Sequence, residues 1–136
     1  MSLEFPTHSR EQIEEYTRKR WWLGLTLGDV LDRIADVFPN REALVDDRVR
    51  LTFGEVRERV ERLANGLMRA GIRQGEAVLV QLPNWAEYIY VYFALQKIGA
   101  IPVILLAGYR QLEVSHLGRL TEATAWIQPL SRLSGT

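Results

Sequence analysis

The feature that most constrains this chain of 136 residues is a succession of apolar runs and helical patterns between residues 77 and 128. The run AVLVQL is apolar without alternation, which is typical of a strand covered on both faces. We predict two further strands, at AIPVILL and TAWIQ, with helices over 85–99 and 109–123. Helices between successive strands indicate an α/β fold with a mostly parallel sheet.

This order of strands and helices calls for right-handed crossovers. We expect two successive crossovers that step the same way, which would place both helices on one face of the sheet. Open parallel sheets are rarely left uncovered on a face. The other face would then be covered by the N-terminal helices, by the remainder of a larger protein or by a second copy of the chain.

Helix starts are marked by capping boxes, in which a Ser or Thr is followed three residues later by a residue that bonds back to it. Three such pairs occur: Ser9 with Gln12, Thr26 with Asp29, and Thr52 with Glu55. We predict a helix after each, the third ending at Gly71. We also expect Asn84 to cap the helix over 85–99.

The segment ALVDDRVRLTF predicts an antiparallel hairpin, because Asp46 and Asp47 tolerate the backbone angles of a tight turn. No linker rich in Pro, Gly or Ser separates two domains. We therefore predict a single partial domain over residues 1–136, with a disordered leader at 1–8, an α/β subdomain at 9–128 and a frayed tail at 129–136.

Composition argues against several classes of function. The 17 basic and 17 acidic side chains give a formal net charge of zero, so we expect no nucleic-acid partner. The absence of cysteine removes disulfides, thiolate zinc sites and thiol nucleophiles. Because no apolar stretch is long enough to cross a bilayer, we expect no membrane association and a cytoplasmic location.

Three stretches carry a family resemblance: LTFGEVRERVERLANGL at 51–67, LPNWAEYIYVYFALQKIGAIPV at 82–103, and RWWLGLTLGDVLDRIADVFPNREALVD at 20–46. Together they resemble the start of the adenylate-forming enzymes, which include acyl-CoA synthetases, aryl-acid AMP ligases and peptide-synthetase adenylation domains. The third stretch, with 108–127, is similar to the ligases that activate 2,3-dihydroxybenzoate and related acids. The resemblance implies the N-terminal part of the large domain of such a ligase.

For the full-length family, the resemblance implies ATP, magnesium, an acyl adenylate and transfer of the acyl group to a thiol. The matching motifs are packing motifs, and the family's phosphate loop has no counterpart here. Ser134, Gly135 and Thr136 spell three of its letters, but no run ending in Lys follows. We therefore predict no catalytic, cofactor-binding or metal-ligating residue in this chain, and no cofactor bound by it alone.

Other residues suggest sites, but each has a simpler interpretation. Glu113 and His116 lie one helical turn apart, yet a metal site needs more ligands from other helices. Asp46 and Asp47 suggest a pair of catalytic carboxylates, but neighbouring residues in a turn point different ways. The aromatic residues of the helix over 85–99 suit core packing better than an aryl-acid pocket, and we expect Trp21 and Trp22 to pack against the body of the fold.

Two functions remain open at this point. The first is an N-terminal fragment of an AMP-forming carboxylic acid:thiol ligase that is inactive alone, so whether the chain counts as an enzyme is left undecided. The second is a stand-alone noncatalytic module that binds itself or a separate ligase subunit. An uncovered sheet face makes a homo-oligomer, or pairing with the missing C-terminal part of the ligase, the expected assembly.

Overall fold

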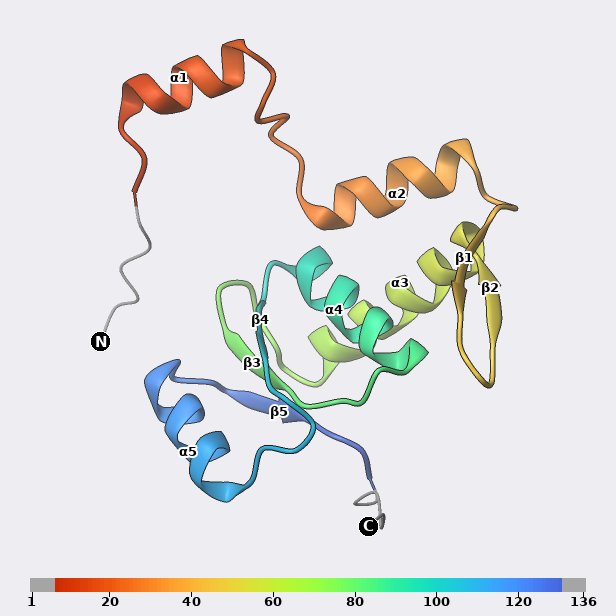
Figure 1. The fold of residues 1–136 in the computed structure, drawn as a ribbon, viewed down its shortest axis with the longest axis vertical. Helices are drawn as coiled ribbons and strands as arrows, with labels where there is room; N and C mark the ends of the chain where they lie inside the picture. The colour runs from red at the N-terminus through yellow and green to blue at the C-terminus, as the bar shows by residue number, and fades with distance from the viewer. Residues whose placement is uncertain (1–6, 131–136) are drawn as a thin grey trace.

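The computed structural model describes residues 7–130, so the predicted leader and tail lie mostly outside the described residues. Figure 1 shows the elements in chain order. They are α1 (Arg10–Arg18), α2 (Leu27–Val37), β1 (Glu42–Val45), β2 (Arg50–Thr52), α3 (Phe53–Arg69), β3 (Ala77–Val80), α4 (Ala86–Ile98), β4 (Ile101–Ile104), α5 (Gln111–Leu120) and β5 (Ala125–Ile127). Within this range, no helix is both long enough and apolar enough to cross a membrane.

The three predicted capping boxes are confirmed at the starts of α1, α2 and α3. In each, the side chain of the Ser or Thr accepts a hydrogen bond from the backbone N–H three residues later, and that later residue accepts one in return. These bonds satisfy N–H groups that have no partner inside a helix. The start of each of these helices is therefore fixed by local sequence.

The parallel sheet has the strand order β4-β3-β5, with β3 in the middle. Val78 pairs with Pro102 of β4 and with Ala125 of β5, both in parallel. Strands β1 and β2 form a separate antiparallel hairpin. The predicted α/β architecture, a mostly parallel sheet with flanking helices and an antiparallel hairpin, is thus confirmed.

The helices α4 and α5 lie on opposite faces of this sheet, so the expectation that both share one face is wrong (Figure 1). The chain steps from β3 to β4 in one direction and then back across β3 to β5. A reversed step moves a right-handed crossover to the other face. We call the two sides the α4 face and the α5 face. Because α5 lies on the second face, this chain itself supplies part of the cover that was expected from the N-terminal helices, a larger protein or a second copy.

The α4 face carries the larger core. Val78 and Val80 of β3 pack against Val91 and Leu95 of α4. A second cluster joins α2, α3, α4 and the hairpin, and Leu63 and Leu67 of α3 contact both clusters. Because these two residues pack against both clusters, the clusters form one continuous apolar core on this face.

The α5 face carries a smaller core, in which Leu79 of β3 packs with Leu105 and Val114. Strand β4, the strand predicted at AIPVILL, borders this core. Its residues are only half-buried, and Ile104 remains 43% exposed. The reason is that β4 is an edge strand with a neighbour on one side only.

The N-terminal arm, which we define as residues 8–24, stands apart from the sheet in Figure 1. Its helix α1 buries no residue. Trp22 packs edge-on against Tyr16 and His8, and Trp21 remains 64% exposed beside Tyr16. The expectation that both tryptophans pack against the body of the fold is therefore wrong, because their contacts are with other aromatic side chains of the arm.

Candidate functional site

A polar hollow lies between the turn of the β1–β2 hairpin and the start of α4. Its volume is about 230 Å³, and it is lined by Asp46, Asp47, Arg48, Asn84 and Trp85. The hairpin turn presents the charged side chains, while the loop after β3 presents the other two. Four of its five lining residues are polar or charged, so the chemistry of the hollow depends on how these side chains are hydrogen-bonded.

Asp46 holds the hairpin turn and also caps α4. Its Oδ1 accepts hydrogen bonds of 2.8 Å from the backbone N–H groups of Arg48 and Val49. Its Oδ2 accepts one of 2.9 Å from the backbone N–H of Ala86 in the first turn of α4. The bond from Arg48, followed by that from Ala86, lowers the pKa of Asp46 below its ordinary value.

The predicted cap of α4 by Asn84 is wrong. Trp85 occupies the N-cap position, and no side chain of the local sequence caps the helix. The carboxylate of Asp46, 40 residues away from Ala86 in the sequence, takes that role instead. The negative charge suits the positive end of the helix dipole, so a tertiary contact supplies what the local sequence lacks.

Arg48 joins the hairpin to α4 through its charge. Its Nη2 donates to Oε2 of Glu87 at 2.5 Å and lies 3.6 Å from Oδ2 of Asp46. Its guanidinium also lies over the Trp85 ring, 5.2 Å from the ring centroid. The hydrogen bond from Arg48 lowers the pKa of Glu87, and the bond to Glu87 raises the pKa of Arg48.

The bonding in the hollow is that of a structural clasp. The carboxylates of Asp46 and Glu87 and the guanidinium of Arg48 are all engaged with one another or with backbone N–H groups. Proton transfer in catalysis needs an acid or base that is available to a substrate. The lining residues include no Ser, Cys, Lys or His, and Asp47 adds one exposed carboxylate beside the clasp.

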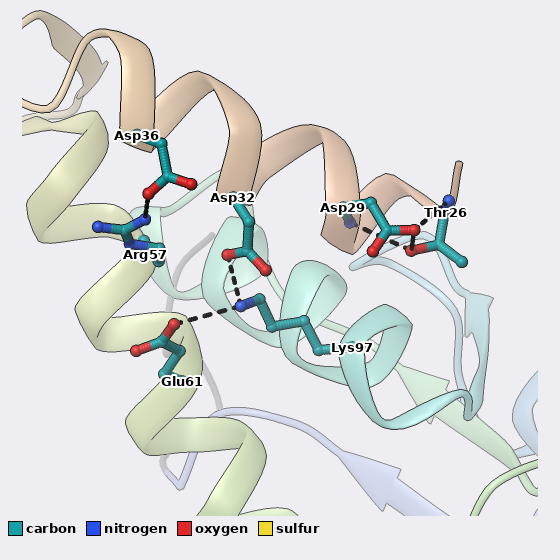
Figure 2. Close-up of polar contacts among 7 residues, drawn as sticks. All are labelled: Thr26, Asp29, Asp32, Asp36, Arg57, Glu61 and Lys97. Carbon is teal, nitrogen blue, oxygen red and sulfur yellow. Dashed lines mark hydrogen bonds and ion pairs between the residues drawn. The ribbon is translucent and has the colours of Figure 1, made fainter. Parts of the chain in front are cut away.

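A second polar cluster, shown in Figure 2, ties α2 to α3 and α4. The Nζ of Lys97 on α4 donates to Asp32 of α2 at 2.6 Å and to Glu61 of α3 at 3.4 Å. Arg57 of α3 pairs with Asp36 of α2. The Lys97 side chain is only 16% exposed, so this network spans three helices at the edge of the core.

Gln81 is a buried polar residue at the carboxyl end of β3. Its Nε2 donates to the backbone carbonyls of Leu106, Ala107 and Tyr109, at 3.2, 3.3 and 2.7 Å. These carbonyls belong to the loop that leads from β4 to α5. One amide group therefore fixes the loop at the end of the sheet, and nothing in the apolar run AVLVQL signals this role.

The residues weighed as metal ligands are not brought together. Glu113 accepts a hydrogen bond of 2.9 Å from the backbone N–H of Arg110 at the start of α5, and His116 is exposed. Within residues 7–130, no group of three or more His, Asp or Glu side chains is placed to hold a metal ion. Ser134, Gly135 and Thr136 lie outside the described residues.

The aromatic side chains of α4 serve mainly in packing. Tyr88 stacks on Tyr92 with ring centroids 6.4 Å apart, and Tyr92 meets Phe93 edge-on at 5.8 Å. Tyr90 packs on the core of the α4 face, and burial raises its pKa. Its buried hydroxyl has no hydrogen-bond partner among the described residues. Trp85 alone lines the polar hollow.

Comparison with known proteins gives a family. A family model described as AMP-binding enzyme matches residues 31–134. Triostin synthetase I of Streptomyces triostinicus is 43% identical over 113 residues, which cover 83% of this chain and 21% of that protein. The 2,3-dihydroxybenzoate-AMP ligase of Bacillus subtilis is 37% identical over 119 residues, which cover 88% and 22%. The chain thus spans about a fifth of the length of these curated relatives.

Solved structures agree with this likeness. The apo structure of MbtA from Mycobacterium smegmatis superposes with a TM-score of 0.86 at 35% identity, over 90% of this chain and 23% of that one. The N-terminal subdomain of NpsA from Klebsiella oxytoca superposes with a TM-score of 0.74 at 25% identity, over 82% and 29%.

Proposed function

Because the chain belongs to the AMP-binding enzyme family, we propose that it forms the N-terminal part of an AMP-forming carboxylic acid:thiol ligase of the aryl-acid type. The observation that carries this proposal is the likeness over residues 31–134 to the family model. Relatives named for 2,3-dihydroxybenzoate and for salicylate support an aryl acid as the substrate class.

In this proposal the chain supplies scaffold rather than catalytic groups and is inactive alone. The guanidinium of Arg48, the cation among the residues that line the polar hollow, is already paired with Glu87, and the carboxylate of Asp46 accepts bonds from backbone N–H groups, which argues against a triphosphate site there. ATP and magnesium would be bound by the rest of the ligase. We place this ligase in the cytoplasm, since a chain of this size without cysteine has no disulfides of the kind found in small secreted domains.

The test is ATP–pyrophosphate exchange with 2,3-dihydroxybenzoate or salicylate as the acid. The purified chain should give no exchange that depends on the acid. A matched chimera, in which this chain replaces the corresponding segment of the Bacillus subtilis 2,3-dihydroxybenzoate-AMP ligase, should retain exchange. Acid-dependent exchange by the isolated chain would contradict the scaffold role, and a chimera that folds but is inactive would contradict the family-level proposal.

A second candidate function is a noncatalytic module that binds itself or a separate ligase subunit. The observation that favours it is the N-terminal arm, where Trp21 and Leu23 are both exposed. Exposed apolar surface of this kind is typical of interaction sites. Sedimentation velocity at micromolar concentration should then show a dimer that Trp21→Ser reduces to a monomer, with Arg10→Ser as the control in the same helix region. A strictly monomeric chain would contradict self-association.

A further inference from the structure

An apolar cavity lies between α2, the strand β1 of the hairpin, α3 and α4. Its volume is about 230 Å³, and all nine side chains that line it are apolar. They come from α2, β1, α3 and α4, and include Val30, Ile34, Leu44 and Phe93. No residue of the polar hollow or of the Lys97 network belongs to this lining.

An irregularity in β1 shapes one wall of the cavity. The pairing of β1 with β2 shifts register between Glu42 and Leu44, which is the position of Ala43. In a regular strand, neighbouring side chains point to opposite faces. Here both Ala43 and Leu44 line the cavity. Such bulges commonly redirect a side chain toward a site, and the small Ala43 leaves space that a larger residue would fill.

The cavity has an opening to solvent. Val30 on α2 is 37% exposed although it lines the cavity, and Ala43 on β1 is exposed as well. The cavity is therefore open to solvent at these two residues. Leu31 and the ion pairs of Lys97 and Arg57 hold α2 against α3 and α4.

We propose that this cavity is a binding site for a neutral monocyclic aromatic molecule. An apolar cavity of about 150 Å³ in another protein stays dry and accepts benzene, so the volume here is sufficient for one ring. An entirely apolar lining provides no partner for a charge, and burying an unpaired carboxylate is strongly unfavourable. The site is therefore distinct from any position that would hold the carboxylate of an aryl acid.

The test is a titration of the full chain with toluene, followed by NMR of methyl-labelled Ile, Leu and Val. The methyl signals of Ile34, Leu44 and Ile89 should shift in a saturable way, whereas those of Leu112 on the exposed side of α5 should stay constant. Benzoate at the same concentrations should leave all of these signals unchanged. Shifts that do not saturate, or equal shifts with benzoate, would overturn the proposal.

Filling the cavity provides the decisive variant. Ala43→Phe should weaken toluene binding at least tenfold, because its ring would occupy the same space. Ala70→Phe, at an exposed position after α3, is the matched control and should bind toluene like the parent chain. If Ala43→Phe fails to fold, Val30→Phe, at a position of α2 that also lines the cavity, serves the same purpose. Unchanged binding in a folded filling variant would overturn the proposal.

The same spectra examine one competing occupant. Trp21 and Trp22 of the N-terminal arm could fill the cavity of another copy of the chain. Nuclear Overhauser contacts between an indole ring and the Ile34 or Leu44 methyls, measured without toluene, would show that a tryptophan occupies the cavity. That result would overturn the proposal of a small-molecule site. Their absence, together with saturable toluene binding, supports the proposal. Neither result depends on adenylation activity, so the proposed function stands or falls separately.

Discussion

The α4 face of the sheet is covered by α4 and α3, on which α2 and the hairpin pack in turn, whereas the α5 face is covered by a single helix. On the α4 face, Val78 and Val80 lie beneath α4, and two apolar clusters merge through α3. On the α5 face, only Leu79, Leu105 and Val114 form the buried cluster. On the α5 face, which has the smaller core, Gln81 also holds the loop before α5 to the end of β3 through hydrogen bonds. The difference teaches that one strand can be held by apolar burial on one side and by hydrogen bonds on the other.

The largest expected effect separates the two faces directly. Leu95→Ala on α4 removes a side chain with no solvent exposure and should lower the free energy of unfolding by about 3 kcal/mol. Val114→Ala on α5 should lower it by about 1 kcal/mol, because fewer buried methyl groups are lost. Urea denaturation of both variants measures the difference, and equal losses would break the comparison.

The next effect concerns the polar tie on the α5 face. Gln81→Leu keeps most of the volume but leaves the carbonyls of Leu106, Ala107 and Tyr109 without their donor. We expect a loss of about 2 kcal/mol and faster amide hydrogen exchange in α5. Gln128→Leu, at an exposed position after β5, is the control. Faster exchange in α3 rather than α5 would show that Gln81 supports the other face.

A smaller effect tests the hairpin contact of the α4 face. The folded-state pKa of Asp46 is lowered from 3.8, so its stabilising contribution is complete above the unfolded-state pKa and is lost as the pH falls through the lower folded-state value. Asp46→Ala should lower the Tm at neutral pH, because Ala86 loses its cap. Asp46→Asn should retain much of the cap but lose this acid dependence. If both variants lose stability at low pH in the same way as the parent chain does, this pH dependence does not come from Asp46.

The smallest effect concerns the network of Figure 2. Lys97→Met removes the ion pairs to Asp32 and Glu61, whose side chains are 40% and 52% exposed, so no carboxylate is left buried. We expect a change in unfolding free energy below about 1 kcal/mol, shrinking further in high salt. Arg62→Met, which removes the exposed pair with Glu58, provides the reference. A loss comparable with that of Leu95→Ala would mean that ion pairs, not apolar burial, dominate the α4 face.

Local features of this fold were predictable from sequence. The capping boxes at Ser9, Thr26 and Thr52 depend on residues three apart, and the buried strand β3 follows from an uninterrupted apolar run. The family resemblance, which is confirmed by the family match, likewise rests on contiguous motifs. In each case the determining interactions lie within a short window of the chain.

Features that depend on distant contacts were missed. The side of β3 on which β5 pairs decides the face of α5, and the crossover pattern alone does not specify that side. Asp46 was correctly placed in a turn, but its bond to Ala86 spans 40 residues and displaced the expected role of Asn84. The cavity beneath α2 likewise depends on how four separate elements meet, and its only local signal is the small residue Ala43.

The central position of β3 has a consequence for biosynthesis. Residues 77–80 are synthesised before either neighbouring strand, at 101–104 and 125–127. Until β5 has been made, one edge of this buried strand lacks its partner, and unpaired strand edges promote aggregation of nascent chains. The segments of α3 and α4, which cover one face of the strand, are synthesised before β5, so that face can be shielded before the second edge is paired.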